Sequence, residues 1–220
     1  IMLDVVRSVS EKVFIPLTVG GGVRNEGDVR NLLSAGADKA ALNTAAVTDP
    51  EVLTRCAWAF GSQAIVVAID ACKVDHYNPT ASERPRVLID NKARHLQLTP
   101  DSSWEVFIHG GRTPTGIDAI RWAAYAVESG AGEILLTSMD ADGHLDGYDL
   151  DLTRAIALNV PVPVIASGGA GRPEHFSTIL SEGKADAALA ASIFHFGQVS
   201  VRQVKDHLLQ DNIPVRIQET

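Results

Sequence analysis

The feature that most constrains the fold is a regular alternation of two patterns along the chain. Short runs rich in β-branched residues are followed by polar or glycine-rich turns, and then by stretches with the apolar periodicity of an amphipathic helix. Apolar strands that are each followed by a helix imply a parallel sheet covered on its outer side. We expect strands at Ile15–Val19, Lys39–Asn43, Ala64–Ala71, Glu133–Ser138, Val162–Ser167 and Ala187–Ala191. We expect helices at Glu26–Ala35, Pro50–Phe60, Ile117–Ser129, Leu152–Leu158, Pro173–Glu182 and Val201–Gln210.

A short motif repeats where helices lead into strands. It is an alanine- and glycine-rich tetrapeptide with an acidic last residue, found at Ala35–Asp38, Gly130–Glu133 and Gly183–Asp186. Glycine suits the left-handed conformation in which many helices end. Units of roughly 30 residues with a common entry signal fit a (β/α)8 TIM barrel of about 250 residues better than an open doubly wound sheet. The predicted fold class is therefore α/β, of the TIM-barrel type.

About six of the eight βα units of such a barrel are visible in the sequence. The chain opens inside an apolar-periodic helix, and no strand precedes it; the pattern consists of Met2, Val5, Val6, Val9 and Val13. We therefore expect an N-terminally truncated barrel that lacks its first two strands and first helix. Residues 1–220 are interpreted as a single barrel domain.

One segment breaks the alternation. Residues 76–113 are proline-rich and polar, with short strand-like pieces at Arg86–Ile89 and Trp104–Ile108. We interpret this segment as a hairpin-like excursion within the barrel and not as a separate domain. It follows a strand, on the side where barrel enzymes carry their active-site loops.

Composition and charge exclude several classes of protein. The net charge of −8 argues against a nucleic-acid-binding protein, which needs a basic face to meet phosphates. The longest apolar runs are too short to span a bilayer, and no secretory leader is visible, so we expect a cytoplasmic protein. Cys56 and Cys72 give no disulfide framework and are interpreted as buried or half-buried free thiols.

Two glycine-rich turns follow strands on opposite sides of the expected barrel. Gly20–Gly22 follows the first visible strand, and Ser167–Gly171 follows a strand four positions later. Glycines permit unusual backbone angles and let amide groups approach a ligand closely. The sequence therefore indicates two anion sites at the barrel mouth.

Small polar residues follow the next strand after each glycine turn. They are Asn43–Thr44 and Ala191–Ser192, which would place N–H and hydroxyl donors beside the two turns. An alternative is that the hydroxyls of Thr44 and Ser192 cap helices, although a capped helix start and a phosphate site share the same free amides. The pattern predicts a bisphosphate ligand that lies across the barrel mouth.

Asp70 is the strongest candidate for a catalytic group. It ends the apolar run Ile65–Ile69, and a carboxylate in that position is costly unless it is paired or faces a site. It is interpreted as a general acid or base, with a structural Asp that binds loop amides as the alternative. The following strand ends in Asp140–Gly143, which we assign to a turn or phosphate loop because the other ligands of a calcium loop are absent. His175 and His195 lack ligand spacing and are interpreted as packing or capping residues, so no metal site is expected.

Several linked motifs resemble the cyclase-subunit family of imidazole glycerol phosphate synthase. The resemblance covers nearly the whole chain except the region around Asn78–Val106, which is longer than that family usually carries. The motifs, in order, are Thr18–Val23, Gly36–Lys39, Asn43–Ala46, Phe60–Gln63, Ala68–Ala71, Gly132–Ser138, Asp142–Gly143, Gly147–Asp149, Ile165–Gly171, Glu174–Phe176 and Ala190–His195.

The resemblance implies a two-part enzyme of histidine biosynthesis that needs no cofactor. The family's cyclase uses ammonia to convert a bisphosphorylated ribulosyl-formimino aminoimidazole carboxamide nucleotide into imidazole glycerol phosphate and aminoimidazole carboxamide ribonucleotide. Ammonia comes from a glutaminase partner that docks at the amino-terminal face of the barrel, and it travels through the barrel centre. No nucleic acid or membrane is implied.

The resemblance also implies roles for individual residues. Asp70 matches one of the family's two acid–base aspartates, and the other lies on the first strand of the family, which this chain lacks. Lys39 and Glu133 match members of a charged gate for ammonia, with a structural ion pair as the alternative, and Asp38 and Gln63 map towards the partner interface. One phosphate would be bound by Gly22, Asn43 and Thr44, and the other by Asp142, Gly143, Gly168, Gly169, Ala191 and Ser192.

Two rival functions are weighed against the cyclase. The sister isomerase of the same pathway shares the half-barrel repeat, the phosphate loops and a pair of aspartates, but Gly61–Gln63 and Ser192–His195 look like the cyclase. A non-catalytic phosphate-binding barrel is the second rival. It is disfavoured because Asp70 and Ser192, which a decayed enzyme would lose readily, are both present.

Overall fold

A curved parallel sheet forms the centre of the molecule. This computed structural model describes residues 2–74 and 95–216, and six of its strands pair side by side in the order β1-β2-β3-β6-β7-β8. Each neighbouring pair in that order is parallel. The strands are β1 (Thr18–Gly20), β2 (Lys39–Leu42), β3 (Ile65–Lys73), β6 (Glu133–Ser138), β7 (Val164–Ser167) and β8 (Ala187–Leu189). The predicted α/β class, with about six βα units of a TIM barrel, is confirmed.

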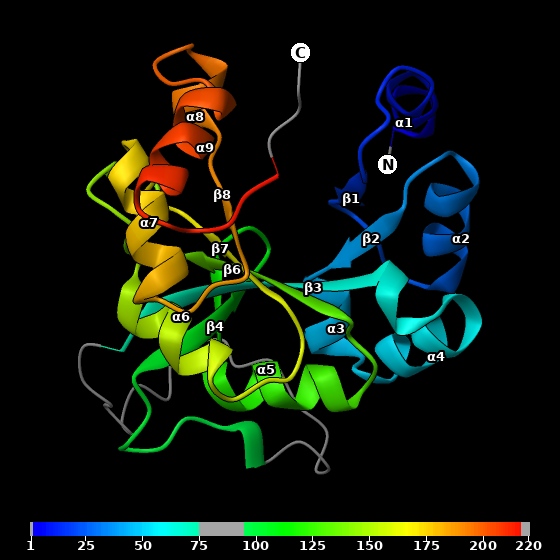
Figure 1. Ribbon diagram of the computed structural model, residues 1–220. Coiled ribbons are helices and arrows are strands. Elements are labelled where there is room, and N and C mark those ends of the chain that lie inside the picture. Colours follow the sequence, from blue (N-terminus) through cyan, green and yellow to red (C-terminus); the bar gives the residue numbers. More distant parts are fainter. Residues whose placement is uncertain (1, 75–94, 217–220) are drawn as a thin grey trace.

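Helices surround the outer side of the sheet (Figure 1). The six predicted helices are present, with ends that agree or shift by one or two residues. They are α2 (Glu26–Ser34), α4 (Glu51–Phe60), α5 (Ala119–Glu128), α6 (Leu150–Ala157), α7 (Pro173–Ser181) and α9 (Val201–Gln210). The chain opens on α1 (Leu3–Ser10), which packs beside α2. Three short elements were not predicted: α3 (Thr44–Thr48), α8 (Ser192–His195) and the 3-10 turn η1 (Ser62–Ala64). None of the described helices is long and apolar enough to cross a membrane.

The two faces of the sheet have different surroundings. On β3, Val67 and Ile69 are fully buried in the core that the sheet shares with the helices. Ala68 and Asp70 alternate with them, so they point to the inner face of the curved sheet and are only partly buried. The inner face is therefore where side chains of the parallel strands remain accessible.

An antiparallel hairpin is attached to β3. It consists of β4 (Trp104–Ile108), which matches a predicted strand piece, and β5 (Thr113–Asp118), which was not predicted. The other predicted piece, Arg86–Ile89, lies outside the described residues. The helix predicted from Ile117 begins later, because Ile117 and Asp118 still belong to β5. The Asp118 carboxylate then caps α5 by accepting from the amides of the second and third following residues.

Several predicted strand boundaries differ from the observed ones by one to three residues, and two of them do so for local reasons. The strand expected from Ile15 starts only at Thr18, and Pro16, which lies between them, has no N–H to offer to a strand ladder. The strand expected to reach Ala191 ends at Leu189, because the chain then turns into α8. Both differences shorten strands without changing their order.

The first and last strands of the parallel order are the least covered. In β1 and β8 only the middle residue is partly buried, and the residues on either side are exposed. Within the described residues, β1 and β8 are not paired with each other, so the sheet curves as an open half-barrel (Figure 1). The carboxyl ends of its strands lie together on one rim, as they do in every parallel sheet of this kind.

Candidate functional site

Asp70 lies on the inner face near the carboxyl-terminal rim. It pairs in register with Thr137 of β6, which in turn pairs with Ser167 of β7. These three side chains therefore form one polar row across the sheet. The strand expected to end at Ala71 continues to Lys73, because it pairs there with β4.

The surroundings of Asp70 favour an acid–base role. Burial raises the pKa of the Asp70 carboxyl, and the nearby charge of Asp142 raises it further. The side-chain amide of Asn43 opposes these effects, since its Nδ2 donates to Asp70 Oδ2 over 3.0 Å and so lowers the pKa. A carboxyl whose pKa moves towards neutrality exchanges protons more readily at physiological pH.

Three predicted phosphate-binding residues lie at the ends of β1 and β2. Gly22 is exposed in the turn after β1, with a φ angle of 75°. Asn43 and Thr44 follow β2, where Asn43 is the cap residue and Thr44 the first residue of α3. The Thr44 hydroxyl does not cap the helix, so the capping interpretation was wrong for this residue; Thr44 Oγ1 instead accepts from the backbone amide of His109 over 3.1 Å.

The tip of the β4–β5 hairpin belongs to the same rim, which sequence reasoning missed. His109, Gly110 and Gly111 adopt successive left-handed conformations with φ angles of 57°, 66° and 75°. A side chain is rarely tolerated in that region unless the surroundings hold it, and His109 is held by Thr44 and by a 3.2 Å contact of its Nδ1 with Thr113 Oγ1. The glycine pair after the predicted strand at Trp104–Ile108 was the available signal.

The second group of predicted phosphate residues lies beyond β6 and β7. Gly168 and Gly169 follow β7 with φ angles of 93° and 100°. A Cβ on Gly169 would lie 2.0 Å from the Gly147 carbonyl oxygen, and one on Gly168 would lie 3.3 Å from the Asp142 backbone. Gly143 also has a positive φ, but its Cβ position is open. The glycine loop therefore packs directly against the segment that carries Asp142 and Gly143.

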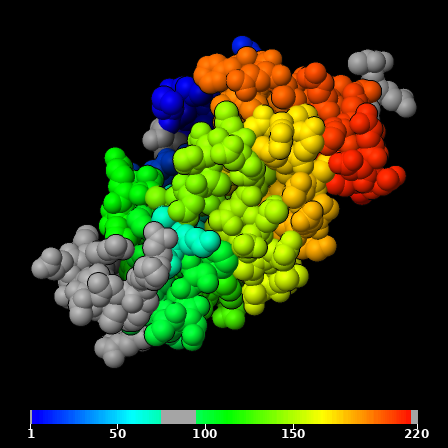
Figure 2. Space-filling model, turned by 90° about the vertical axis from the view of Figure 1, so that its left-hand side faces the viewer, coloured from blue at the N-terminus to red at the C-terminus, as the bar shows by residue number. Residues whose placement is uncertain are grey.

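Ala191 and Ser192 follow β8 beside this loop. Ala191 is the cap residue of α8 and Ser192 is its first residue, and no side chain caps this helix. The hydroxyl of Ser192 is therefore not a capping group, contrary to the alternative interpretation. Figure 2 shows this side of the molecule, where the end of β3 lies between the hairpin residues and the segment that follows β6.

Lys39 and Glu133 meet at the opposite end of the sheet. They are the first residues of β2 and β6, and Lys39 Nζ forms an ion pair with Glu133 Oε2. The register places both on the inner face, because Ala41 and Glu133 each pair with Val66. Their side chains are only 29% and 13% exposed, so the pair is largely withdrawn from solvent.

Asp38 and Gln63 lie at the same amino-terminal end. Asp38 precedes β2, and its Oδ2 accepts from the Leu17 amide over 2.7 Å, which ties the approach to β1 in place. Gln63 lies in η1, directly before β3, and is exposed. Both predicted interface residues are thus on one surface, at the end of the sheet opposite Asp70.

The histidines named above pack locally. His175 Nδ1 accepts from the Gly171 amide over 3.1 Å, and burial lowers the pKa of its imidazole. His195 packs edge-on against Phe196. Across the described ranges, no group of three His, Cys, Asp or Glu side chains is placed to hold a metal ion. Cys56 is buried and Cys72 half-buried, and the two form no disulfide with each other.

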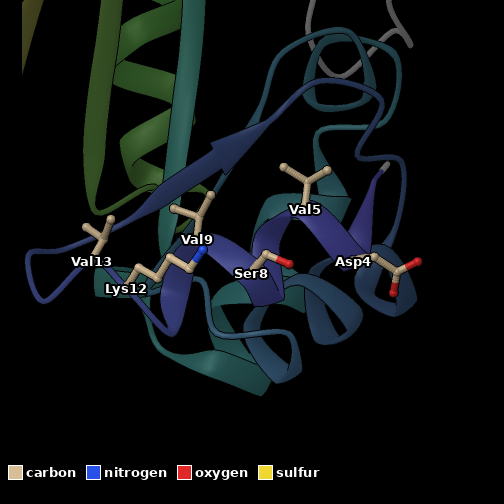
Figure 3. Close-up of a pocket in the computed structure, with 6 residues that line it drawn as sticks. All are labelled: Asp4, Val5, Ser8, Val9, Lys12 and Val13. Atoms are coloured by element: carbon tan, nitrogen blue, oxygen red, sulfur yellow. The ribbon is translucent and has the colours of Figure 1, made fainter.

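A separate hollow lies on α1, away from this rim. Figure 3 shows its lining, which contains no predicted site residue and consists of Asp4, Val5, Ser8, Val9, Lys12 and Val13. It is therefore not part of the candidate site.

Two comparisons with known proteins found matches over most of the chain. Residues 1–200 match the family described as "Histidine biosynthesis protein". The chain is 52% identical over 214 residues to a protein of Endomicrobium trichonymphae named "Imidazole glycerol phosphate synthase subunit HisF". The match covers 97% of this chain and 72% of that relative.

Proposed function

Since this chain belongs to the histidine biosynthesis protein family, and within it to the HisF cyclase subunits of imidazole glycerol phosphate synthase, we propose that it acts as that cyclase. In this role it converts the bisphosphorylated ribulosyl-formimino nucleotide and ammonia into imidazole glycerol phosphate and aminoimidazole carboxamide ribonucleotide. The observation that carries the proposal is the position of one half-buried carboxylate, Asp70, between two glycine-rich loops on the same rim.

The two loops fit the two phosphates of the substrate. One lies at the ends of β1 and β2 and the other at the ends of β7 and β8, so they flank β3 and β6 from opposite sides. Backbone amides of such turns bind phosphate without basic side chains, which agrees with the acidic charge of the chain. Holding both ends of the substrate fixes its reactive centre over Asp70, and such positioning can lower a barrier by several kcal/mol.

Asp70 supplies one of the proton transfers of the reaction. Ring closure joins the ammonia nitrogen to substrate carbon, and loss of the leaving nucleotide breaks a carbon–nitrogen bond, so protons must be both removed and delivered. The raised pKa of the Asp70 carboxyl suits it to this exchange.

An ammonia route along the inner face joins the two ends of the sheet. Glu133 and Asp70 are separated by four residues in register along β3, a span of about 13 Å. The inner-facing positions between them are apolar and include Ala68, Leu135 and Ile165. An apolar path lets neutral ammonia pass while excluding ions, so the pair of Lys39 and Glu133 is proposed as the gate.

The amino-terminal surface is proposed as the docking site of a glutaminase partner. The relative's name describes it as a subunit, which implies an assembly. Asp38 and Gln63 flank the gate on this surface and would contact the partner. The protein is assigned to the cytoplasm, with no cofactor, nucleic acid or membrane involved in its reaction.

Replacing Lys39 tests the gate. We expect Lys39→Met to lower turnover driven by glutamine in the complex, while turnover driven by free ammonium is kept, because the damage lies at the entrance and not at Asp70. Without Lys39, Glu133 is left unpaired, which should lower the free energy of unfolding by about 1–3 kcal/mol. The loss is smaller than for a fully buried pair, because both side chains are partly exposed. Arg202→Met, which breaks an exposed pair on α9, is the control and should cost less than about 1 kcal/mol. An equal fall in both activities would make the pair merely structural.

The cyclase and the isomerase are distinguished by their need for ammonia. The bisphosphate substrate of the cyclase is supplied with and without a high ammonium concentration, and its absorbance is followed. Loss of absorbance only with ammonium supports the cyclase. Binding without ammonia-dependent consumption, or conversion of the isomerase substrate in its absence, overturns the proposal.

A further inference from the structure

The side chain of Asn43 is directed at Asp70 and not at the phosphate loop. Its Nδ2 donates to Asp70 Oδ2 over 3.0 Å, from the cap position of α3 to the β3 end of the polar row. An ionised carboxylate accepts only from the nitrogen of an amide, so this contact fixes which way the amide is turned. One N–H of the Asn43 side-chain amide is therefore engaged by Asp70.

The other side-chain atom of Asn43 has no partner. Its Oδ1 is buried and accepts no hydrogen bond within the described part of the chain. A buried acceptor without a donor lowers the free energy of unfolding by about 1–3 kcal/mol. An atom of this kind in a native protein therefore calls for a partner, such as a ligand or a water molecule. Asn43 Oδ1 lies next to Asp70 and the first turn of α3, where the bound substrate would supply the missing donor.

We propose that Asn43 is a positioning residue, whose amide nitrogen aims the Asp70 carboxylate and whose amide oxygen accepts from a hydroxyl or N–H group of the bound substrate. The substrate part of this inference rests on the proposed cyclase function. The ribulosyl chain between the two phosphates carries hydroxyl groups of the required kind. The link from Asn43 to Asp70 stands on the contact alone.

The effect of Asn43 on the Asp70 pKa has the opposite sign to the effects of burial and of the nearby charge. Asp142, from the segment after β6, is the ionisable group whose charge acts on Asp70, and it raises the carboxyl pKa. The strand neighbours of Asp70, Thr137 and Phe107, carry no charge. Removing the Asn43 amide therefore leaves burial and Asp142, which both raise the Asp70 pKa.

The test follows the titration of Asp70 in Asn43→Leu, which keeps the side-chain shape but removes both amide atoms. The carboxyl pKa is measured by 13C NMR of the protein labelled at aspartate, with Asp70→Asn used to assign the signal. We expect the Asp70 pKa to rise, because its hydrogen-bond donor is lost. The limb of the pH–rate profile that reports Asp70 should move to higher pH whether Asp70 works as acid or base, and kcat should fall about 10- to 100-fold.

Two further variants keep the result interpretable. Asn43→Gly removes the side chain but suits a helix cap almost as well as Asn, so it covers the case in which the leucine variant fails to fold. Asn31→Leu removes an exposed amide on α2 and should leave the Asp70 titration and kcat unchanged. A rise in KM in both Asn43 variants is expected from loss of the Oδ1 contact.

The outcomes separate this inference from the proposed function. An Asp70 carboxyl that titrates at the same pH in the wild type and in Asn43→Gly would overturn the positioning role. An unchanged KM in both Asn43 variants would overturn the substrate contact. If the wild type shows no ammonia-dependent turnover, the cyclase proposal fails, and the NMR titration still decides whether Asn43 controls Asp70.

Discussion

Asp70→Asn is expected to lower ammonia-dependent turnover at least a hundredfold while binding of the bisphosphate is kept. Asparagine has nearly the same shape and still meets Asn43, but it cannot exchange a proton. Removing a general acid or base typically costs 10²–10⁴-fold in rate. Steady-state kinetics at saturating ammonium, together with calorimetric titration of the bisphosphate, measures the two effects separately.

The same variant has a second expected signature in its stability. Burial raises the pKa of Asp70 in the folded state above its unfolded value, so the stability that this carboxyl contributes is fully present below the unfolded pKa and is lost as pH rises through the folded pKa. Asparagine stays neutral throughout. Asp70→Asn should therefore become more stable than the wild type as pH rises through that range. Solvent screening of the half-buried group limits the gain to about 1 kcal/mol.

Two outcomes would contradict this account of Asp70. Turnover within tenfold of the wild type would remove Asp70 from the chemistry. A large loss of bisphosphate affinity would instead assign it to binding. Urea unfolding at several pH values completes the test, since a stability difference that does not change with pH would show that Asp70 has no raised pKa.

Gly169→Ala is expected to abolish phosphate binding at the second proposed site and to destabilise the fold by about 3 kcal/mol or more. The new Cβ would lie 2.0 Å from the Gly147 carbonyl oxygen, a backbone atom that cannot move aside cheaply. The φ of 100° adds strain that only glycine avoids. The Gly147 amide also donates to the Gly169 carbonyl over 2.8 Å. Displacing either of these two loop segments therefore breaks the hydrogen bond and opens the loop.

A matched glycine separates steric overlap from backbone strain. Gly197 follows α8 with a φ of 66°, and nothing lies within 4 Å of its Cβ position, so Gly197→Ala should cost only about 1–2 kcal/mol. Affinity for the bisphosphate should fall at least a hundredfold in Gly169→Ala and stay unchanged in Gly197→Ala. Equal unfolding free energies for the two variants would show that the contact with Gly147 does not constrain the loop.

The position of the Lys39–Glu133 pair and of Asp70 on one face of the sheet follows from the register of the strands. The pairing that joins Val66 to Glu133 also joins Asp70 to Thr137, and side chains alternate between the faces of a strand. A slip of one residue would move Asp70 into the helical core and Glu133 away from Lys39. The burial of Val67 and Ile69 in the core fixes the register of β3, and this register keeps Asp70 on the inner face.

The sequence by itself determined the six parallel strands, the longer helices and their order. A continuous apolar run predicted β6 to the residue, and helical periodicity predicted α9 to the residue. Both signals depend only on neighbours along the chain. The short helices α3 and α8 escaped prediction, since a single turn carries too few residues to show a period. The strand β5 escaped as well, because Thr113–Gly116 contains proline and glycine, which argue against a strand.

Tertiary structure alone decided which side chains meet. Asn43 reaches Asp70 across 27 residues, His109 reaches Thr44 across 65, and Lys39 reaches Glu133 across 94. The first contact requires β2 to pair with β3, and the second also requires β4 to pair with β3. The third requires β3 to pair with β6 past the inserted hairpin, and none of these pairings has a local signature. The sequence pattern could place a carboxylate and two glycine loops on one rim. Only the packed sheet could show that the Asn43 side chain faces the Asp70 carboxylate. The direction of that side chain depends on the register between β2 and β3 and on which polar groups lie close enough to bond.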